Sequence, residues 1–209
     1  MFIVNILCPV LFYFIGSIPF GFIVAKLAKG VDIRQVGSGN PGATNVWRVL
    51  GKKYGILVFI LDMMKGFLPV FIFDYVTPGQ GRNVFTLLCA IGAILGHTFP
   101  VFLGFKGGKA AATGCGVFIW LSPIPLFISA AAWVLTTFIS RYVSLGSMVS
   151  SVILIICIIL INKEPFGSGL PITLFSIFIS VFLIIRHKSN IKRIISGTEN
   201  KIGRKTKTE

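Results

Sequence analysis

The stretch Ser122-Pro123-Ile124-Pro125 interrupts an apolar run that extends from residue 111 to residue 139. A membrane-spanning helix needs about 20 residues, so this run is too long for one straight crossing. Two prolines this close together remove two backbone N–H donors and break a helix. The run is therefore either one kinked span or a hairpin of two short helices, and this choice decides the number of crossings.

Five further apolar runs lie outward from this stretch, and most have a length that fits one crossing. They cover residues 2–25, 55–76, 84–103, 143–161 and 170–185. The composition agrees, because 55% of the 209 residues are hydrophobic and only 12% are charged, about half the charge of a soluble domain. The mean hydropathy is +0.89. We therefore predict an all-α, polytopic membrane protein that forms a single domain over residues 1–209.

The distribution of basic residues decides between the kinked span and the hairpin. The loop 26–53 carries six Lys and Arg residues against Asp32, and the tail from about residue 186 carries eight against two Glu. Both segments should be cytoplasmic, because loops rich in Lys and Arg stay on that side of the membrane. Only an odd number of crossings satisfies both. We predict seven transmembrane helices, two of them short and paired as a hairpin, with the N-terminus outside and the C-terminus cytoplasmic.

The charge balance also limits the partners. Lys and Arg number 20 against 6 Asp and Glu. This excess either reflects topology and anionic lipids alone, or includes cations that bind an anionic substrate. Nucleic acid is excluded, since the basic residues flank apolar spans and form no soluble face. The few acidic residues are not clustered, so no metal site is predicted. The cysteines Cys8, Cys89, Cys115 and Cys157 lie in apolar stretches and are interpreted as buried small hydrophobes.

The first cytoplasmic loop contains a glycine-rich segment, GSGNPGATN at 37–45. A dinucleotide-binding fold is rejected, because a membrane span precedes the loop and no βαβ unit surrounds it. Glycines reach positive φ and let backbone N–H groups converge on an anion. A helix starting near Thr44 would point its N-terminus at a phosphate. The alternative is a plain interhelical turn. The candidate ligands are Gly37, Ser38, Gly39, Asn40, Gly42, Thr44, Asn45 and Arg48.

A second segment, Lys106-Gly107-Gly108-Lys109, follows the third apolar run. Two lysines around two glycines can hold a phosphate dianion, or they can anchor the helix end at the membrane surface by snorkelling. His97, just before this segment, is either a satisfied helix-end histidine or a catalytic base. It is followed at the fifth position by Phe102, so the His-Asp dyad of thioester-using acyltransferases is missing from the sequence.

Polar residues also occur in or beside later spans. Ser144 and Ser147 lie three residues apart on one helix face, and each hydroxyl can bond a phosphate or its own backbone. Asp62 and Lys65 lie at i and i+3 inside the second span, where ionisable groups are costly unless paired. We predict a structural ion pair between them.

These stretches, in this order, resemble the acyl-phosphate:glycerol-3-phosphate acyltransferase (PlsY) family over nearly the whole chain. One departure is visible, since family members commonly continue FKGGK with Gly and this chain has Ala110. The matching segments are GSIPFG at 16–21, GSGNPGATN at 37–45, Asp62 with Lys65-Gly66, LGHTFPVFLGFKGGK at 95–109, SLGS at 144–147 and RHKSNIKR at 186–193.

The resemblance implies a seven-helix enzyme of the bacterial cytoplasmic (inner) membrane with a cytoplasmic-facing active site. The primary hydroxyl of glycerol 3-phosphate would attack a fatty acyl-phosphate, giving lysophosphatidic acid and inorganic phosphate, with no cofactor or metal. Membrane lipids and the enzyme that makes the acyl phosphate are the implied partners. His97, His187 or a substrate phosphate would act as the base. By analogy the cationic pocket comprises Arg48, Lys106, Lys109, Ser144, His187 and Asn190.

Two other functions compete with this interpretation. A transporter of an organic phosphate or other anion would use the same cations and glycine breaks. Transporters usually place broken helices at the membrane midplane in paired repeats, and no internal repeat is visible here. A structural membrane protein would leave the polar loops unexplained.

Overall fold

The computed structural model of the chain describes residues 2–77 and 84–202, and every regular element in these ranges is helical. The chain divides into two compact units, one ending at Trp120 and the other starting at Leu121. The boundary falls beside the Pro123 break that the sequence indicates. The single domain predicted over residues 1–209 stays a prediction, since two compact units can belong to one domain or to two.

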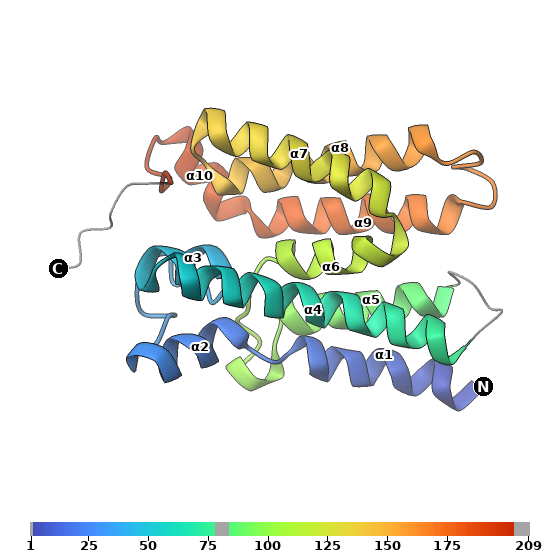
Figure 1. Ribbon diagram of the computed structural model, residues 1–209, viewed down its shortest axis with the longest axis horizontal. Coiled ribbons are helices and arrows are strands. Elements are labelled where there is room, and N and C mark those ends of the chain that lie inside the picture. The colour runs from blue at the N-terminus through green and yellow to red at the C-terminus, as the bar shows by residue number, and fades with distance from the viewer. Residues whose placement is uncertain (1, 78–83, 203–209) are drawn as a thin grey trace. The chain divides into compact units, whose positions relative to one another are not determined.

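The first unit is built around three long helices. α1, α4 and α5 pack against one another, and the short helix α3 packs on α4 (Figure 1). Small residues allow the close contact of α1 with α5. A Cβ atom on Gly16 would collide with the carbonyl of Ala93, and one on Gly96 with the carbonyl of Tyr13. The elements are α1 (Phe2–Gly16), α2 (Phe20–Lys29), α3 (Ala43–Leu50), α4 (Lys52–Val76), α5 (Val84–Thr98), the 3₁₀ turn η1 (Val101–Leu103) and α6 (Ala111–Leu121).

The second unit contains four helices, and α8 packs against both α7 and α9. α10 follows α9 after a bend of 55° at His187. The short segment after α10 returns to the turn between α7 and α8, where Ile202 N–H donates a 2.9 Å hydrogen bond to the carbonyl of Arg141. The helices are α7 (Pro123–Ser140), α8 (Val143–Ile161), α9 (Leu170–Arg186) and α10 (Lys188–Ile195).

The predicted break in the run 111–139 is confirmed. α6 ends at Leu121, α7 begins at Pro123, and Ser122 between them has φ −154° and ψ 72°. Because Pro123 carries no N–H group, it can occupy the first position of α7 without losing a hydrogen bond. The 11 residues of α6 rise only about 16 Å, roughly half the hydrocarbon core.

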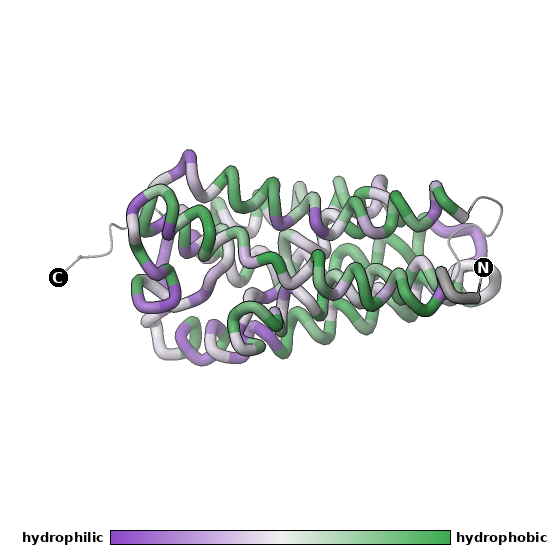
Figure 2. Tube along the Cα trace, turned by 90° about the horizontal axis from the view of Figure 1, so that it is seen from below, coloured by the Kyte–Doolittle hydropathy of each residue, from purple (hydrophilic) through white to green (hydrophobic). Residues whose placement is uncertain are grey.

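The membrane class is confirmed by length and hydropathy. Within residues 2–77 and 84–202, five helical segments are long and apolar enough to cross a membrane, or six if the bent pair α9 and α10 is one span. Figure 2 shows hydrophobic residues along the long helices and hydrophilic residues gathered near helix ends. The number seven stays a prediction, since α6 is shorter than the other candidates.

Candidate functional site

The loop between α2 and α3 begins with an exposed ion pair. The Arg34 guanidinium lies 2.7 Å from Asp32 and hydrogen-bonds its carboxylate. Through these hydrogen bonds Arg34 lowers the pKa of Asp32 to about 2. Asp32 therefore stays ionised and neutralises Arg34 at any physiological pH.

The glycine-rich segment has the backbone conformation that its sequence predicts. Gly37 has φ 63° and Gly39 has φ 68°, in the left-handed region that residues with a Cβ rarely adopt. A Cβ atom on Gly37 would also collide with Oδ1 of Asn45. Two features therefore require glycine at position 37, namely the positive φ and the close approach of the Asn45 side chain.

The side chain of Asn45 fixes the backbone of this segment by hydrogen bonds. Its buried side-chain amide accepts a hydrogen bond from Ser38 N–H at 2.8 Å and donates to the carbonyls of Ile33 and Val36 at 3.1 and 3.0 Å. Both atoms of the amide thus bond the loop backbone. This gives Asn45 a role in shaping the loop, and its predicted direct contact with a substrate stays a prediction.

The helix α3 starts one residue before the predicted position. Gly42 is its N-cap, and Gly42 N–H donates to Oδ1 of Asn40 at 2.9 Å. The first N–H groups of a helix lack acceptors within the helix and attract anions. Thr44 is exposed in this first turn, and Arg48 lies one turn further along α3. The amides of Ser38, Gly39 and Gly42 already donate within the protein, so in this cradle of loop and helix start an anion would be met by the first turn of α3.

The second candidate segment closes the end of α5. Gly107 N–H donates to the carbonyl of Thr98, and Gly108 N–H donates to the carbonyl of His97, both at 3.1 Å. These two amides satisfy helix-end carbonyls, so an anion here would be met by lysine side chains. Lys106 is exposed and Lys109 is half-buried.

Ala110 stands where the family that the sequence resembles commonly has Gly, and its backbone adopts the left-handed conformation that glycine favours. Its φ is 61° and its side chain is buried. An L-residue in this region carries a strain of about 1–2 kcal/mol. The departure from the family pattern is therefore visible as backbone strain directly after Lys109.

His97 lies beside the predicted ion pair, which is confirmed. Lys65 Nζ lies 2.9 Å from Asp62 Oδ1, and Lys65 also donates to the carbonyl of Ile18 at 2.9 Å. The same Asp62 oxygen lies 3.6 Å from Nδ1 of His97. On the other side of the ring, a Cβ atom on Gly108 would collide with Nε2. All three ionisable side chains are at least 90% buried.

The contact of Asp62 with His97 was not among the predictions, because the two residues lie on different helices. One feature of the sequence could have indicated it. Ionisable residues inside a membrane span, such as Asp62 and Lys65, are costly and usually have polar partners on other helices. Enclosure of both ring nitrogens favours a structural role for His97 over that of a general base.

In the second unit, Glu199 joins two predicted site residues. Its Oε1 accepts hydrogen bonds from Ser144 Oγ at 2.8 Å and Asn190 Nδ2 at 2.7 Å, and Oε2 accepts one from Arg193 at 2.7 Å. Burial raises the pKa of Glu199, but the hydrogen bonds from Asn190, Ser144 and Arg193 outweigh it, so the pKa lies below its ordinary value. Sequence reasoning missed Glu199, which it counted only as a counter-charge in the basic tail.

Ser147 and His187 both bond the backbone. Ser147 Oγ donates to the carbonyl of Val143 at 3.0 Å and accepts from Trp133 Nε1 at 3.3 Å. Nδ1 of His187 lies 2.8 Å from the carbonyl of Leu183. Their predicted contacts with a substrate stay predictions. The structure brings Ser144 to Glu199 and Ser147 to Trp133, so the two serines have different neighbours.

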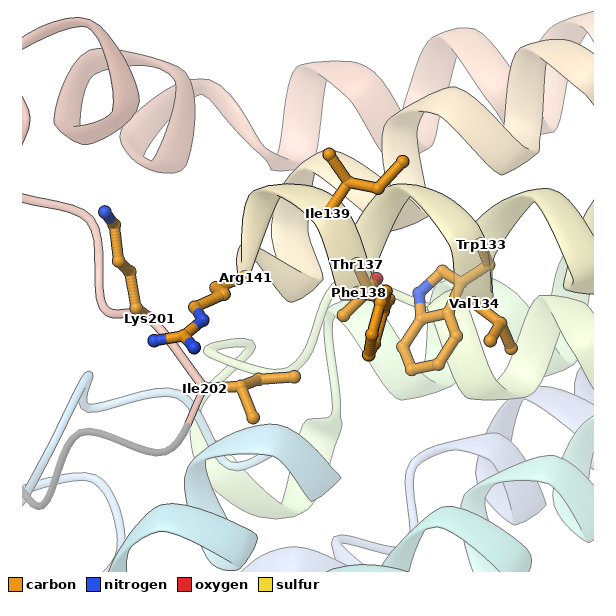
Figure 3. Close-up of a pocket in the computed structure, with 8 residues that line it drawn as sticks. All are labelled: Trp133, Val134, Thr137, Phe138, Ile139, Arg141, Lys201 and Ile202. Atoms are coloured by element: carbon orange, nitrogen blue, oxygen red, sulfur yellow. The ribbon is translucent and has the colours of Figure 1, made fainter.

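The second unit also contains a hollow along α7 (Figure 3). Most of its wall is apolar, and Arg141 and Lys201 lie together at one end. This arrangement suits a molecule with an apolar chain and an anionic head group. The lining residues are Trp133, Val134, Thr137, Phe138, Ile139, Arg141, Lys201 and Ile202. Among the described residues, no group of three or more His, Cys, Asp and Glu side chains could hold a metal ion.

Comparisons with known proteins match nearly the whole chain. Residues 6–197 match a protein-family model described as glycerol-3-phosphate acyltransferase. A glycerol-3-phosphate acyltransferase of Desulforamulus reducens is 46% identical over 193 residues, 92% of each chain. A glycerol-3-phosphate acyltransferase 2 of Bacillus anthracis is 45% identical over 202 residues, 95% of this chain and 99% of the relative.

Two solved structures share the fold. A crystal structure of PlsY (YgiH), an integral membrane glycerol 3-phosphate acyltransferase, in its glycerol 3-phosphate form matches with a TM-score of 0.87 at 40% identity. The match covers 95% of this chain and 96% of that one. The lysophosphatidic acid form of PlsY matches with a TM-score of 0.85 at 39% identity, over 95% of each chain.

Proposed function

Because the chain belongs to the PlsY family of integral membrane glycerol-3-phosphate acyltransferases, we propose that it acylates sn-glycerol 3-phosphate from a fatty acyl-phosphate. The 1-hydroxyl is acylated, and lysophosphatidic acid and inorganic phosphate are the products. The reaction is the first acylation of phospholipid synthesis. The acceptor and product are supported by the two similar PlsY structures, which are a glycerol 3-phosphate form and a lysophosphatidic acid form.

The observation that carries this proposal is the cradle made by the first cytoplasmic loop. Gly37 and Gly39 have positive φ, Asn45 fixes the loop backbone, and α3 begins directly behind it. A helix N-terminus behind a glycine-rich loop is a common phosphate-binding arrangement. Both substrates of the proposed reaction are phosphate esters or anhydrides, so a phosphate cradle is the element the reaction needs first.

The remaining predicted site residues are proposed to complete the pocket around two phosphates. Lys106 and Lys109 supply charge, and Arg48 follows the cradle on α3. Polar groups of the second unit are proposed to contribute hydrogen bonds. The full proposed set is Gly37, Ser38, Gly39, Asn40, Gly42, Thr44, Asn45, Arg48, Lys106, Gly107, Gly108, Lys109, Ser144, Ser147, His187 and Asn190.

The proposed reaction requires no protein nucleophile, because an acyl phosphate is already activated. The hydroxyl oxygen forms a bond to the acyl carbon, the bond from that carbon to the phosphate oxygen breaks, and phosphate leaves with the electron pair. His97 is enclosed between Asp62 and Gly108, and His187 bonds the carbonyl of Leu183. We therefore propose that a substrate phosphate oxygen takes the hydroxyl proton. The enzyme contributes positioning and charge stabilisation.

The proposal includes the seven-helix topology in a bacterial cytoplasmic (inner) membrane. α6 and α7 would form the hairpin, which keeps the basic first loop and the basic tail on the cytoplasmic side. The apolar hollow of α7, with Arg141 and Lys201 at one end, supports binding of an anionic amphiphile from the bilayer. The enzyme that makes the acyl phosphate is the proposed partner.

Phosphate release by the purified protein tests this function. With palmitoyl phosphate and glycerol 3-phosphate, we expect one phosphate released per lysophosphatidic acid formed. With palmitoyl-coenzyme A as donor, we expect little or no lysophosphatidic acid. Comparable turnover with the thioester would contradict the proposed donor, and absence of turnover with both donors would contradict the proposed function.

A further inference from the structure

Asp62 and Lys65 are buried residues in the middle of α4. Their side chains contact two other segments of the first unit. Lys65 donates to the carbonyl of Ile18, in the break between α1 and α2. Asp62 lies beside His97, the penultimate residue of α5. The attraction within an ion pair buried this deeply offsets the desolvation of its charges only where further polar contacts satisfy them, and the Ile18 carbonyl and His97 are such contacts here.

His97 transmits this contact to the segment of the two lysines. Its Nδ1 edge faces Asp62 and its Nε2 edge faces the backbone of Gly108. Gly108 N–H in turn donates to the His97 carbonyl, and Gly107 N–H donates to that of Thr98. At 3.6 Å the contact with Asp62 is electrostatic, and the carboxylate favours the tautomer that carries its proton on Nδ1. The backbone of segment 106–109 therefore packs, at Gly108, against an imidazole ring that lies beside Asp62.

We infer that Asp62 is a positioning residue of the acyl transfer, which orients His97 and thereby holds Lys106 and Lys109 at a substrate phosphate. The inference rests on the proposed function. Lys65 balances the charge of Asp62 and binds the same carboxylate oxygen that lies beside His97. A misplacement of about 1 Å in such a segment is expected to lower the rate by about tenfold to a hundredfold.

The test separates positioning from stability with two variants. Asp62→Asn/Lys65→Met removes both charges together, which often restores the stability that loss of one partner costs. Asp62→Glu keeps the charge but displaces the carboxylate. For both we expect detergent unfolding temperatures near that of the unaltered protein, with kcat/KM for at least one substrate reduced about tenfold to a hundredfold. Phosphate release and thermal unfolding are measured on the same preparations.

Asp74 provides a matched control on the same helix. Its carboxylate accepts hydrogen bonds from Thr86 and from Trp120, and it lies near the C-terminal end of α4. Asp74→Asn should lower the unfolding temperature and leave both KM values and kcat unchanged. Kinetics like those of the unaltered protein in both Asp62 variants would overturn the inference, as would an equal loss in Asp74→Asn. Inactivity of the unaltered protein would instead contradict the proposed function.

Discussion

The backbone N–H of Ser38 donates a 2.8 Å hydrogen bond to Oδ1 of Asn45, seven residues further along the chain. The bond ties the glycine-rich loop to the first turn of α3, and it is made entirely within the protein. The loop therefore has its shape before an anion arrives. The first turn of α3 is thereby held in place beside the loop, and preorganised donors need no rearrangement when charge develops in a transition state.

Gly39→Ala tests whether the loop is a cradle or a plain turn. Gly39 and Gly30 both have φ 68°, so alanine at either position should cost about 1–2 kcal/mol of stability. Only Gly39 belongs to the loop, where a Cβ atom would lie 3.1 Å from the carbonyl of Arg34, whereas Gly30 ends α2 in open space. We expect a somewhat lower unfolding temperature for Gly39→Ala than for Gly30→Ala, with a raised KM only for Gly39→Ala. Unchanged kinetics in Gly39→Ala would make the loop a turn.

Arg48→Ala and Lys109→Ala test the proposed phosphate contacts. Each lost charge-assisted contact should cost about 1.5–3 kcal/mol, roughly ten- to a hundredfold in kcat/KM. Lys163→Ala, in an exposed loop of the second unit, is the control. Steady-state phosphate release gives the comparison. Near-normal kinetics in both test variants would assign these cations to membrane anchoring.

Ala110→Gly should stabilise the protein. Relief of the strain at φ 61° raises the free energy of unfolding by about 1–2 kcal/mol. The greater freedom of glycine in the unfolded chain lowers it by about 0.4–1 kcal/mol. A thermal-unfolding curve in detergent should shift upward by roughly 1–4 °C. A downward shift would show that the methyl group's packing outweighs its strain.

Glu199 should make stability depend on acid. Its pKa is lowered in the folded protein, so its contribution is complete above the unfolded pKa of about 4.3 and is lost as the pH falls through the lower folded pKa. Glu199→Gln should be less stable at pH 7 and should lose less stability on acidification. Unfolding curves between neutral and acid pH test this.

The exposed Glu164 serves as the comparison for that experiment. Glu164→Gln should follow the curve of the unaltered protein across the same pH range. An identical acid dependence for Glu199→Gln and the unaltered protein would show that other carboxylates are responsible.

The seven-helix topology predicts which loops are reachable from outside the cell. In a background without Cys8, Cys89, Cys115 and Cys157, single cysteines at Ser38 and Ser196 should resist an impermeant thiol reagent in intact cells. A cysteine at Ser168 should react, because its loop is predicted to lie outside. All three positions are exposed in the structure. Labelling of Ser38→Cys or Ser196→Cys would overturn the topology.

Local chemistry explains what the sequence could predict. The break at Pro123 and the positive φ values of Gly37 and Gly39 follow from single residue types, and both are confirmed. The pair Asp62 and Lys65 follows from helical spacing and is also confirmed. The all-α membrane class follows in the same way from the lengths of the apolar runs.

Contacts between distant segments could not be predicted in this way. The neighbours Asp62 and His97 come from different helices, and Glu199 meets Ser144 across 55 residues. The break between α1 and α2 was also missed, although Pro19 lies in it, because hydropathy continues through the break. The spacing of residues along one sequence does not indicate which residues of different helices come into contact.

The hydrogen bonds of Asp74 impose an order on biogenesis. Lys65 finds the Ile18 carbonyl on chain already synthesised, whereas Asp74 depends on Thr86 and on Trp120, 46 residues later. At roughly 5–20 residues per second, the ribosome needs about 2–9 s to deliver Trp120. Until both donors are present, Asp74 lacks the two hydrogen bonds that it has in the folded protein. A released chain ending at residue 83 should consequently integrate α4 less efficiently than the same chain carrying Asp74→Asn.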